Sequence, residues 1–173
     1  MLKELPTWID PTRLALTHSH LNGRIAFVQM ERLRDSLCDI QGDAQIDWFF
    51  AMDDKQRPTI VGGLQAQLLM LCQRCLQPMS WAIDKQVALV ILTYELNKNE
   101  ELSADYEAIT LTKTPVLLKT LIEDELILAL PIIARHEVCP SHEYQLSENL
   151  DQDLTCRNNQ FNILSNIKNL KLM

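Results

Sequence analysis

The sequence predicts an α+β fold: an antiparallel β meander, able to curl toward a barrel, with one long helix packed on a face and short terminal helices. Three consecutive segments, 44–52, 60–70 and 81–94, have the alternation or the β-branched and aromatic composition typical of strands. Short polar turns separate them, which favours antiparallel pairing. One segment, 115–130, instead has the apolar spacing of a helix.

Size and charge limit the classes of function. The 173 residues predict a single domain over 1–173, without internal repeats or a linker, and such a chain buries its core without needing a disulfide or a metal. With 16 Lys+Arg against 23 Asp+Glu, the net charge is −7. This charge has the wrong sign for coating a phosphate backbone, so we expect no DNA partner and only local contact with RNA.

The first residues, MLKELPTWIDP, lack the apolar core of a signal peptide, and no apolar run reaches membrane-spanning length. We therefore expect a cytoplasmic protein with no membrane partner. Under reducing conditions its five cysteines are expected to be thiols or metal ligands rather than disulfides. They are Cys38, Cys72, Cys75, Cys139 and Cys156.

Two short helices are predicted near the N-terminus. Asp10 followed by Pro11 has the pattern of a helix N-cap and first turn. Residues 28–37 have apolar side chains at helical spacing, which predicts a helix with one buried stripe. The stripe consists of Met30, Leu33 and Leu37.

The alternation within the predicted strands assigns their faces. In 44–52 the apolar face carries Ala44, Ile46, Trp48, Phe50 and Met52. In 60–70, Gln65 and Gln67 point away from the apolar side chains between and around them. The acidic stretch 95–114 is expected to be an exposed loop with one short strand at 108–111.

Thr114 and Pro115 are expected to cap the long helix, 115–130, and Pro131 to end it. Its predicted apolar side consists of Leu117, Leu118, Leu121, Ile122 and Leu128. Beyond it, 141–160 is expected to be a mobile acidic segment and 161–173 an amphipathic tail carrying Lys168 and Lys171.

The motif CQRC places Cys72 and Cys75 where one strand ends and a hairpin connection begins, as in zinc knuckles. Cys139 and His142 could complete a tetrahedral Cys3His zinc site, with His136 as the alternative histidine. The other interpretation is a pair of reduced thiols that cap the hairpin. No cofactor other than this zinc is expected.

Enzyme motifs are not found. The cysteine pair follows a strand, whereas a thioredoxin-type thiol requires a helix N-terminus. The string HEVCPSHE fails the HExxH spacing, because Pro140 stands where the second histidine is needed. Phosphate-binding loops and GxSxG elbows are absent too, so we expect a protein that is not an enzyme.

Glu123, Asp124 and Glu125 are consecutive, so on a helix they cannot all face one substrate. They form either a solvated helix face or a set in which Glu123 or Glu125 lies beside the core. In the second case the carboxylate bonds to an arginine such as Arg74 or Arg135, or to a partner molecule.

The strings WIDPTRLA, CQRCLQPM and IEDELILALPIIARHE, in this order along nearly the whole chain, resemble the YceD family, the large ribosomal RNA subunit accumulation proteins. The family's C-terminal NPF-L-L tail is similar to the end of this chain, where Gln160 stands in place of the proline. The similar residues are Asn159, Phe161, Leu164 and Leu170.

This resemblance implies a role in the synthesis, processing or stability of 23S ribosomal RNA, without a known catalytic reaction. The implied partners are a ribosomal RNA precursor, a ribosomal protein or an rRNA-processing enzyme. We expect partner contacts at Arg74, Glu123, Asp124, Glu125, Arg135, His136, Lys168 and Lys171. The competing hypothesis is a zinc- or thiol-dependent enzyme that uses the cluster of Cys72, Cys75 and Cys139.

Overall fold

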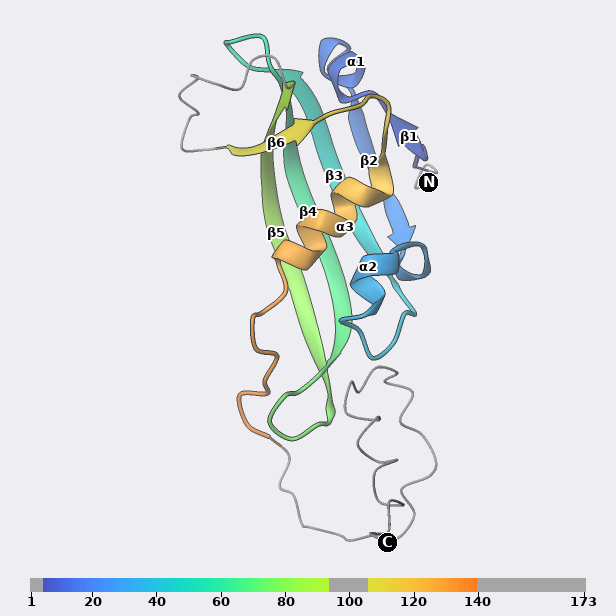
Figure 1. The fold of residues 1–173 in the computed structure, drawn as a ribbon, viewed down its shortest axis with the longest axis vertical. Helices are drawn as coiled ribbons and strands as arrows, with labels where there is room; N and C mark the ends of the chain where they lie inside the picture. The colour runs from blue at the N-terminus through green and yellow to red at the C-terminus, as the bar shows by residue number, and fades with distance from the viewer. Residues whose placement is uncertain (1–4, 94–105, 140–173) are drawn as a thin grey trace, which may run out of the picture.

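A computed structural model describes residues 5–93 and 106–139 as an open β-sheet with helices on one side (Figure 1). The sheet has five strands in the order β2-β3-β4-β5-β6, antiparallel from β2 to β5 and parallel between β5 and β6. They are β2 (His20–Ala26), β3 (Asp43–Met52), β4 (Pro58–Leu71), β5 (Pro78–Thr93) and β6 (Glu107–Leu111). The α+β class is thus confirmed, with a sheet that is not closed into a barrel.

Four helical segments and a small ribbon complete the described part. The helices are α1 (Pro11–Leu16), the 3-10 turn η1 (Phe27–Gln29), α2 (Glu31–Arg34) and α3 (Leu118–Leu128). Strands β1 (Trp8–Ile9) and β7 (Val116–Leu117) pair antiparallel in a separate ribbon. No helix among the described residues is long and apolar enough to cross a membrane.

The core lies between the sheet and α3, which crosses the face of β3, β4 and β5 (Figure 1). Alternation within the strands provides this apolar face, as the sequence predicted. The largest fully buried side chains are Trp48, Phe27, Phe50, Met30, Leu33, Ile46, Ile60, Leu64, Leu68, Leu118, Ile122 and Leu126.

The N-terminal helix forms as predicted. The Asp10 side chain accepts a hydrogen bond from the Arg13 N–H at 3.2 Å, and Pro11 occupies the first turn. The next prediction, a helix over 28–37, is wrong in extent, because only η1 and α2 are helical. Helix α2 ends at Arg34, and four residues later the Cys38 N–H donates to the Leu69 carbonyl of β4 at 2.8 Å. The expected stripe of Met30, Leu33 and Leu37 is nevertheless buried.

Strand β2 was not predicted, because His20–Ala26 is largely polar and alternates weakly. It is a strand because β3 offers it an edge: seven consecutive residue pairs join the two strands, from His20 opposite Phe49 to Ala26 opposite Asp43. Backbone pairing, not side-chain pattern, determines this element.

The long helix is shorter than predicted, since α3 begins at Leu118 rather than at Pro115. Residues Val116 and Leu117 instead pair with Ile9 and Trp8 as β7. The predicted position of Leu128 was also wrong, because that side chain is 69% exposed whereas Leu126 is fully buried. From Leu118 the buried spacing i, i+3, i+4, i+8 includes Leu126 and omits Leu128.

Several predictions fall on residues that the structure does not describe. The acidic segment 141–160, the tail 161–173 and most of the acidic loop, 94–105, lie outside the described residues. The short strand predicted within the loop is confirmed as β6.

Adjacent glycines in β4 give a test of the sheet's packing. A Cβ added at Gly62 would lie 1.9 Å from the Asp47 carbonyl oxygen, whereas one added at Gly63 meets only the Gln86 side chain, at 3.9 Å. We expect Gly62→Ala to lower the free energy of unfolding by about 1–3 kcal/mol, as overpacking does. Gly63→Ala, the matched control, should change it little. Urea denaturation measures both, and equal midpoints for the two variants would contradict the packing described.

Candidate metal centre

The turn that joins β4 to β5 holds the CQRC motif in a closed loop. The Cys72 N–H donates to the Gln77 carbonyl at 2.9 Å, and the Leu76 N–H donates to the Cys72 carbonyl at 2.9 Å. Leu76 adopts a left-handed φ of 58° to make this turn. Cys72 and Cys75 are both buried inside it, so the loop fixes two thiols close together.

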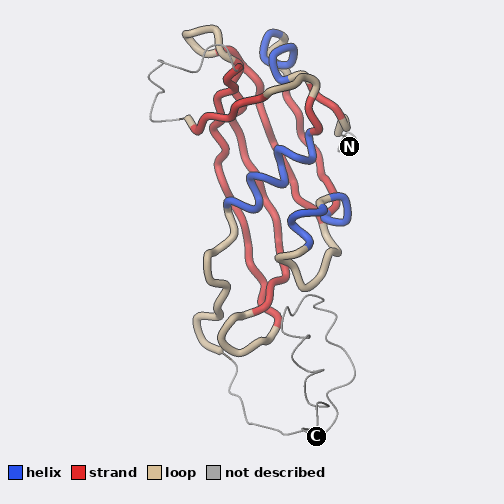
Figure 2. Tube along the Cα trace, viewed as in Figure 1, coloured by secondary structure: helices blue, strands red, loops and turns tan. Residues whose placement is uncertain are grey.

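The segment after α3, residues 131–139, is here called the strap. It has no helix or strand and reaches the turn at the end of the β4–β5 hairpin (Figure 2). The Gln73 N–H donates to the Ala134 carbonyl at 2.8 Å, and Arg74 Nη2 donates to the His136 carbonyl at 3.2 Å. These bonds hold the strap against the turn and bring a histidine and a third cysteine to the first two.

Four side chains converge there: Cys72, Cys75, His136 and Cys139, whose ligand atoms all lie within 4.8 Å of one another. The Cys72 and Cys139 sulfurs are 3.8 Å apart, and Cys75 Sγ lies 3.4 Å from His136 Nδ1. Two sulfurs about 2.3 Å from a tetrahedral zinc would be separated by about 3.8 Å. The cluster could therefore hold a metal ion, and its donor set and spacing fit zinc.

The structure tests part of the predicted Cys3His zinc site. The three predicted cysteines meet, and His136, the alternative histidine, joins them. His142 lies outside the described residues. No disulfide joins any of the four cysteines in the described part, in agreement with the prediction.

Backbone N–H groups stabilise negative charge in the cluster. Burial alone would raise the pKa of Cys72, but the N–H groups of Cys75, His136 and Arg74 outweigh it and lower this pKa to about 5. Burial raises the pKa of Cys75, against the effect of the Gln77 N–H, and the neighbouring sulfurs of Cys139 and Cys72 raise it further. The thiolate of Cys72 is thus favoured at neutral pH, whereas Cys75 is held more strongly in its protonated form.

The predicted partner-contact residues near the cluster have different environments. The Arg74 guanidinium donates to Cys139 Sγ at 2.8 Å, so it belongs to the cluster. Arg135 is exposed and makes no hydrogen bond or ion pair with the residues that the structure describes. Lys168 and Lys171 lie outside that part of the chain. Contact of these residues with a partner stays a prediction.

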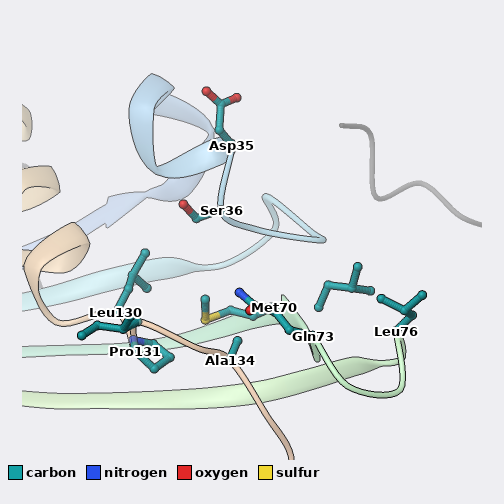
Figure 3. Close-up of a pocket in the computed structure, with 10 residues that line it drawn as sticks. Asp35, Ser36, Met70, Gln73, Leu76, Leu130, Pro131 and Ala134 are labelled. Atoms are coloured by element: carbon teal, nitrogen blue, oxygen red, sulfur yellow. The ribbon is translucent and has the colours of Figure 1, made fainter. Parts of the chain in front are cut away.

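A pocket of about 500 Å³ opens beside the strap (Figure 3). Leu130 and Ala134 line one wall, Met70 of β4 and Leu76 of the turn line others, and Asp35 lies at the loop after α2. The strap therefore forms part of the pocket wall and also supplies two residues of the cluster.

Glu123 is buried, with 5% of its surface exposed, and bonds to the first turn of α2. Its carboxylate accepts from the N–H groups of Arg32 at 2.7 Å and Leu33 at 3.0 Å, and from the Arg32 guanidinium at 3.2 Å. Arg32 also donates to Asp124 at 2.6 Å. Glu123 therefore joins α3 to α2, whereas Asp124 stays half-exposed.

Glu125 is 4% exposed and accepts from Lys85 Nζ at 2.7 Å. Lys85 lies opposite Leu64 in the register of β4 and β5, on the face that packs against α3. The carboxylates thus bond to Arg32 and Lys85, not to Arg74 or Arg135, and a solvated face was wrong for Glu123 and Glu125. Lys85 could have been found from the sequence, as the charged residue between the apolar Ile83 and Val87.

The metal cluster and the buried carboxylates both lie in the part of the chain that matches a known protein family. A family model described as large ribosomal RNA subunit accumulation protein YceD matches residues 60–171. A curated protein of that name from Haemophilus influenzae is 32% identical over 173 residues, covering 95% of this chain and 97% of the relative. No solved structure matches the chain. The residues matched to the family include the whole cluster and both buried carboxylates.

The Lys85–Glu125 pair gives a second stability test. Lys85→Met leaves the Glu125 carboxylate buried without its cation, so we expect the free energy of unfolding to fall by about 3 kcal/mol. The double variant Lys85→Met/Glu125→Leu removes both charges and should regain most of that loss. Lys113→Met, at an exposed lysine, is the control. If urea denaturation shows equal stability for Lys85→Met and Lys113→Met, the buried pair does not stabilise the fold.

Proposed function

The chain belongs to the YceD family, and on this premise we propose that it promotes the accumulation of 23S ribosomal RNA by binding rather than by catalysis. The family match is the observation that carries this conclusion. The relative of similar length is named for large ribosomal RNA subunit accumulation, so participation in that process follows for this chain. We place the activity in the cytoplasm, where ribosomal subunits assemble.

The chemistry of the described residues favours binding. Glu123 and Glu125 are bonded to the protein's own amides and cations, so neither is placed to act as a general acid or base. The cluster offers four protein ligands, and a zinc held by four protein ligands has no open position for a substrate. Both observations argue against the zinc- or thiol-dependent enzyme.

We assign zinc to the cluster as a structural ion, held by Cys72, Cys75, His136 and Cys139. When bound, it supplies a cross-link between the hairpin turn and the strap. The protein's residues supply the charge balance and the positions of the ligands.

The net charge of −7 favours a basic partner, such as a ribosomal protein or an rRNA-processing enzyme, over extensive contact with RNA. A ribosomal RNA precursor would be contacted locally. Arg135, exposed on the strap, is the cation best placed for that contact among the described residues near the cluster.

Sedimentation of cell extracts tests the binding. In low salt the protein should co-sediment with precursors of the large subunit, and high salt should release it, because the contact is electrostatic. An unrelated acidic protein of similar mass serves as the control and should stay at the top. Crosslinking of the low-salt fractions then identifies the partner. Protein that stays at the top in both salts would contradict direct association with the particles.

Complementation tests the biological role separately. Expression of this chain in Haemophilus influenzae that lacks its YceD relative should restore the ratio of 23S to 16S ribosomal RNA, measured on total RNA. The relative itself is the positive control, and the empty vector the negative one. An unchanged ratio, with the chain expressed and folded, would show that it does not share the relative's role.

A further inference from the structure

We propose that Arg74 is a positioning residue of the metal site, which balances the charge of the ligand thiolates and fixes the strap so that Cys139 and His136 reach the metal. The inference rests on the zinc assignment made above. It concerns the residue between the two cysteines of CQRC, whose side chain is not a ligand.

Two bonds from one side chain carry the argument. Arg74 Nε lies 2.8 Å from Cys139 Sγ, and Nη2 lies 3.2 Å from the His136 carbonyl oxygen. The guanidinium thus extends from the hairpin turn and holds the strap at two residues, both of which supply ligand atoms to the cluster. The planar guanidinium has several N–H donors and can make both bonds at once. The single ammonium of a lysine does this less well.

The charge of the site calls for a cation at this place. Three thiolates and a neutral imidazole around a divalent zinc leave one net negative charge, and the Arg74 guanidinium neutralises it. Hydrogen bonds to ligand atoms from outside the coordination shell also orient those ligands, and their loss typically weakens metal binding. Arg74 meets both requirements at Cys139, the ligand nearest the end of the described strap.

The strap depends on these contacts because few others hold it. Hydrogen bonds among the described residues join it to the turn. They include the Gln73 N–H to the Ala134 carbonyl, the two bonds of Arg74, the His136 N–H to Cys72 Sγ at 3.4 Å, and the contacts of Cys75 Sγ with His136 Nδ1 and of Cys72 Sγ with Cys139 Sγ. Ala134 is also buried against the core. Weakening the site should therefore release residues 135–139 more than the rest of the fold.

The test measures zinc affinity of the full-length protein by competition with a chromogenic chelator. Arg74→Gln removes the charge and should weaken zinc binding by about 10–100-fold. Arg74→Lys keeps the charge but not the fork, so its affinity should lie between those of Arg74→Gln and the wild type. Arg135→Gln is the matched control, an exposed arginine on the strap with no bond to the described residues, and should bind zinc as the wild type does.

Hydrogen exchange of the zinc-loaded proteins provides a readout that does not depend on the chelator. In Arg74→Gln the amides of 135–139 should exchange faster, while those of β3 and β4 keep wild-type protection, which also shows that the variant is folded. Arg135→Gln should match the wild type throughout.

The outcomes separate the two levels of the proposal. A wild-type protein that binds no zinc overturns the zinc assignment and this inference with it. Wild-type zinc binding that Arg74→Gln leaves unchanged overturns the role of Arg74 alone. Equal losses in Arg74→Gln and Arg135→Gln would do the same, since they would show a general effect of charge. None of these results bears on the proposed role in 23S ribosomal RNA accumulation, which complementation tests.

Discussion

Two carboxylates that face inward from one helix constrain the rest of this structure. A buried charge without a partner destabilises a fold by several kcal/mol, so α3 can lie on the sheet only where Glu123 and Glu125 both find donors. Glu123 finds them in the first turn of α2, and Glu125 finds Lys85 on the core face of β5. The positions of α2, α3 and the sheet are therefore set together. Apolar burial drives the packing, and the ion pairs select one arrangement of it.

The position of α3 in turn determines where the metal cluster forms. The helix ends at Leu128, and the strap that follows continues toward the tip of the β4–β5 hairpin (Figure 1). Strands of 14 and 16 residues carry that tip well past the helix. Cys72 and Cys139, 67 positions apart in the chain, meet there. A metal at this place would tie the hairpin to the strap at the end of the core, to which Cys72 and Cys75 belong.

This arrangement suits a protein that acts through its surface. The buried carboxylates of Glu123 and Glu125 are bonded inside the fold, and the cluster offers four side chains that could hold a metal ion. The residues exposed to solvent near the cluster include Arg74, Arg135 and Glu137 and four apolar side chains, and a pocket with mainly apolar walls opens there. The apolar side chains are Leu76, Ile132, Ile133 and Val138. Such features fit the binding role proposed for this member of the YceD family.

The sequence by itself determined the elements whose signal is local. Alternation predicted β3 and β4, composition rich in Val, Ile, Leu and Trp predicted β5, the pair Asp10 and Pro11 predicted α1, and the CQRC motif predicted a cysteine pair at a hairpin. The tertiary structure alone decided β2, the start of α3, the approach of His136 to the cysteines, and the bonds of Arg32, Lys85 and Arg74. Each of these depends on a partner distant in sequence: β2 on the edge of β3, β7 on β1, and the buried carboxylates on cations about 40 and 90 positions away. A local pattern shows that a side chain needs a partner, but only the packed chain brings one within hydrogen-bond distance.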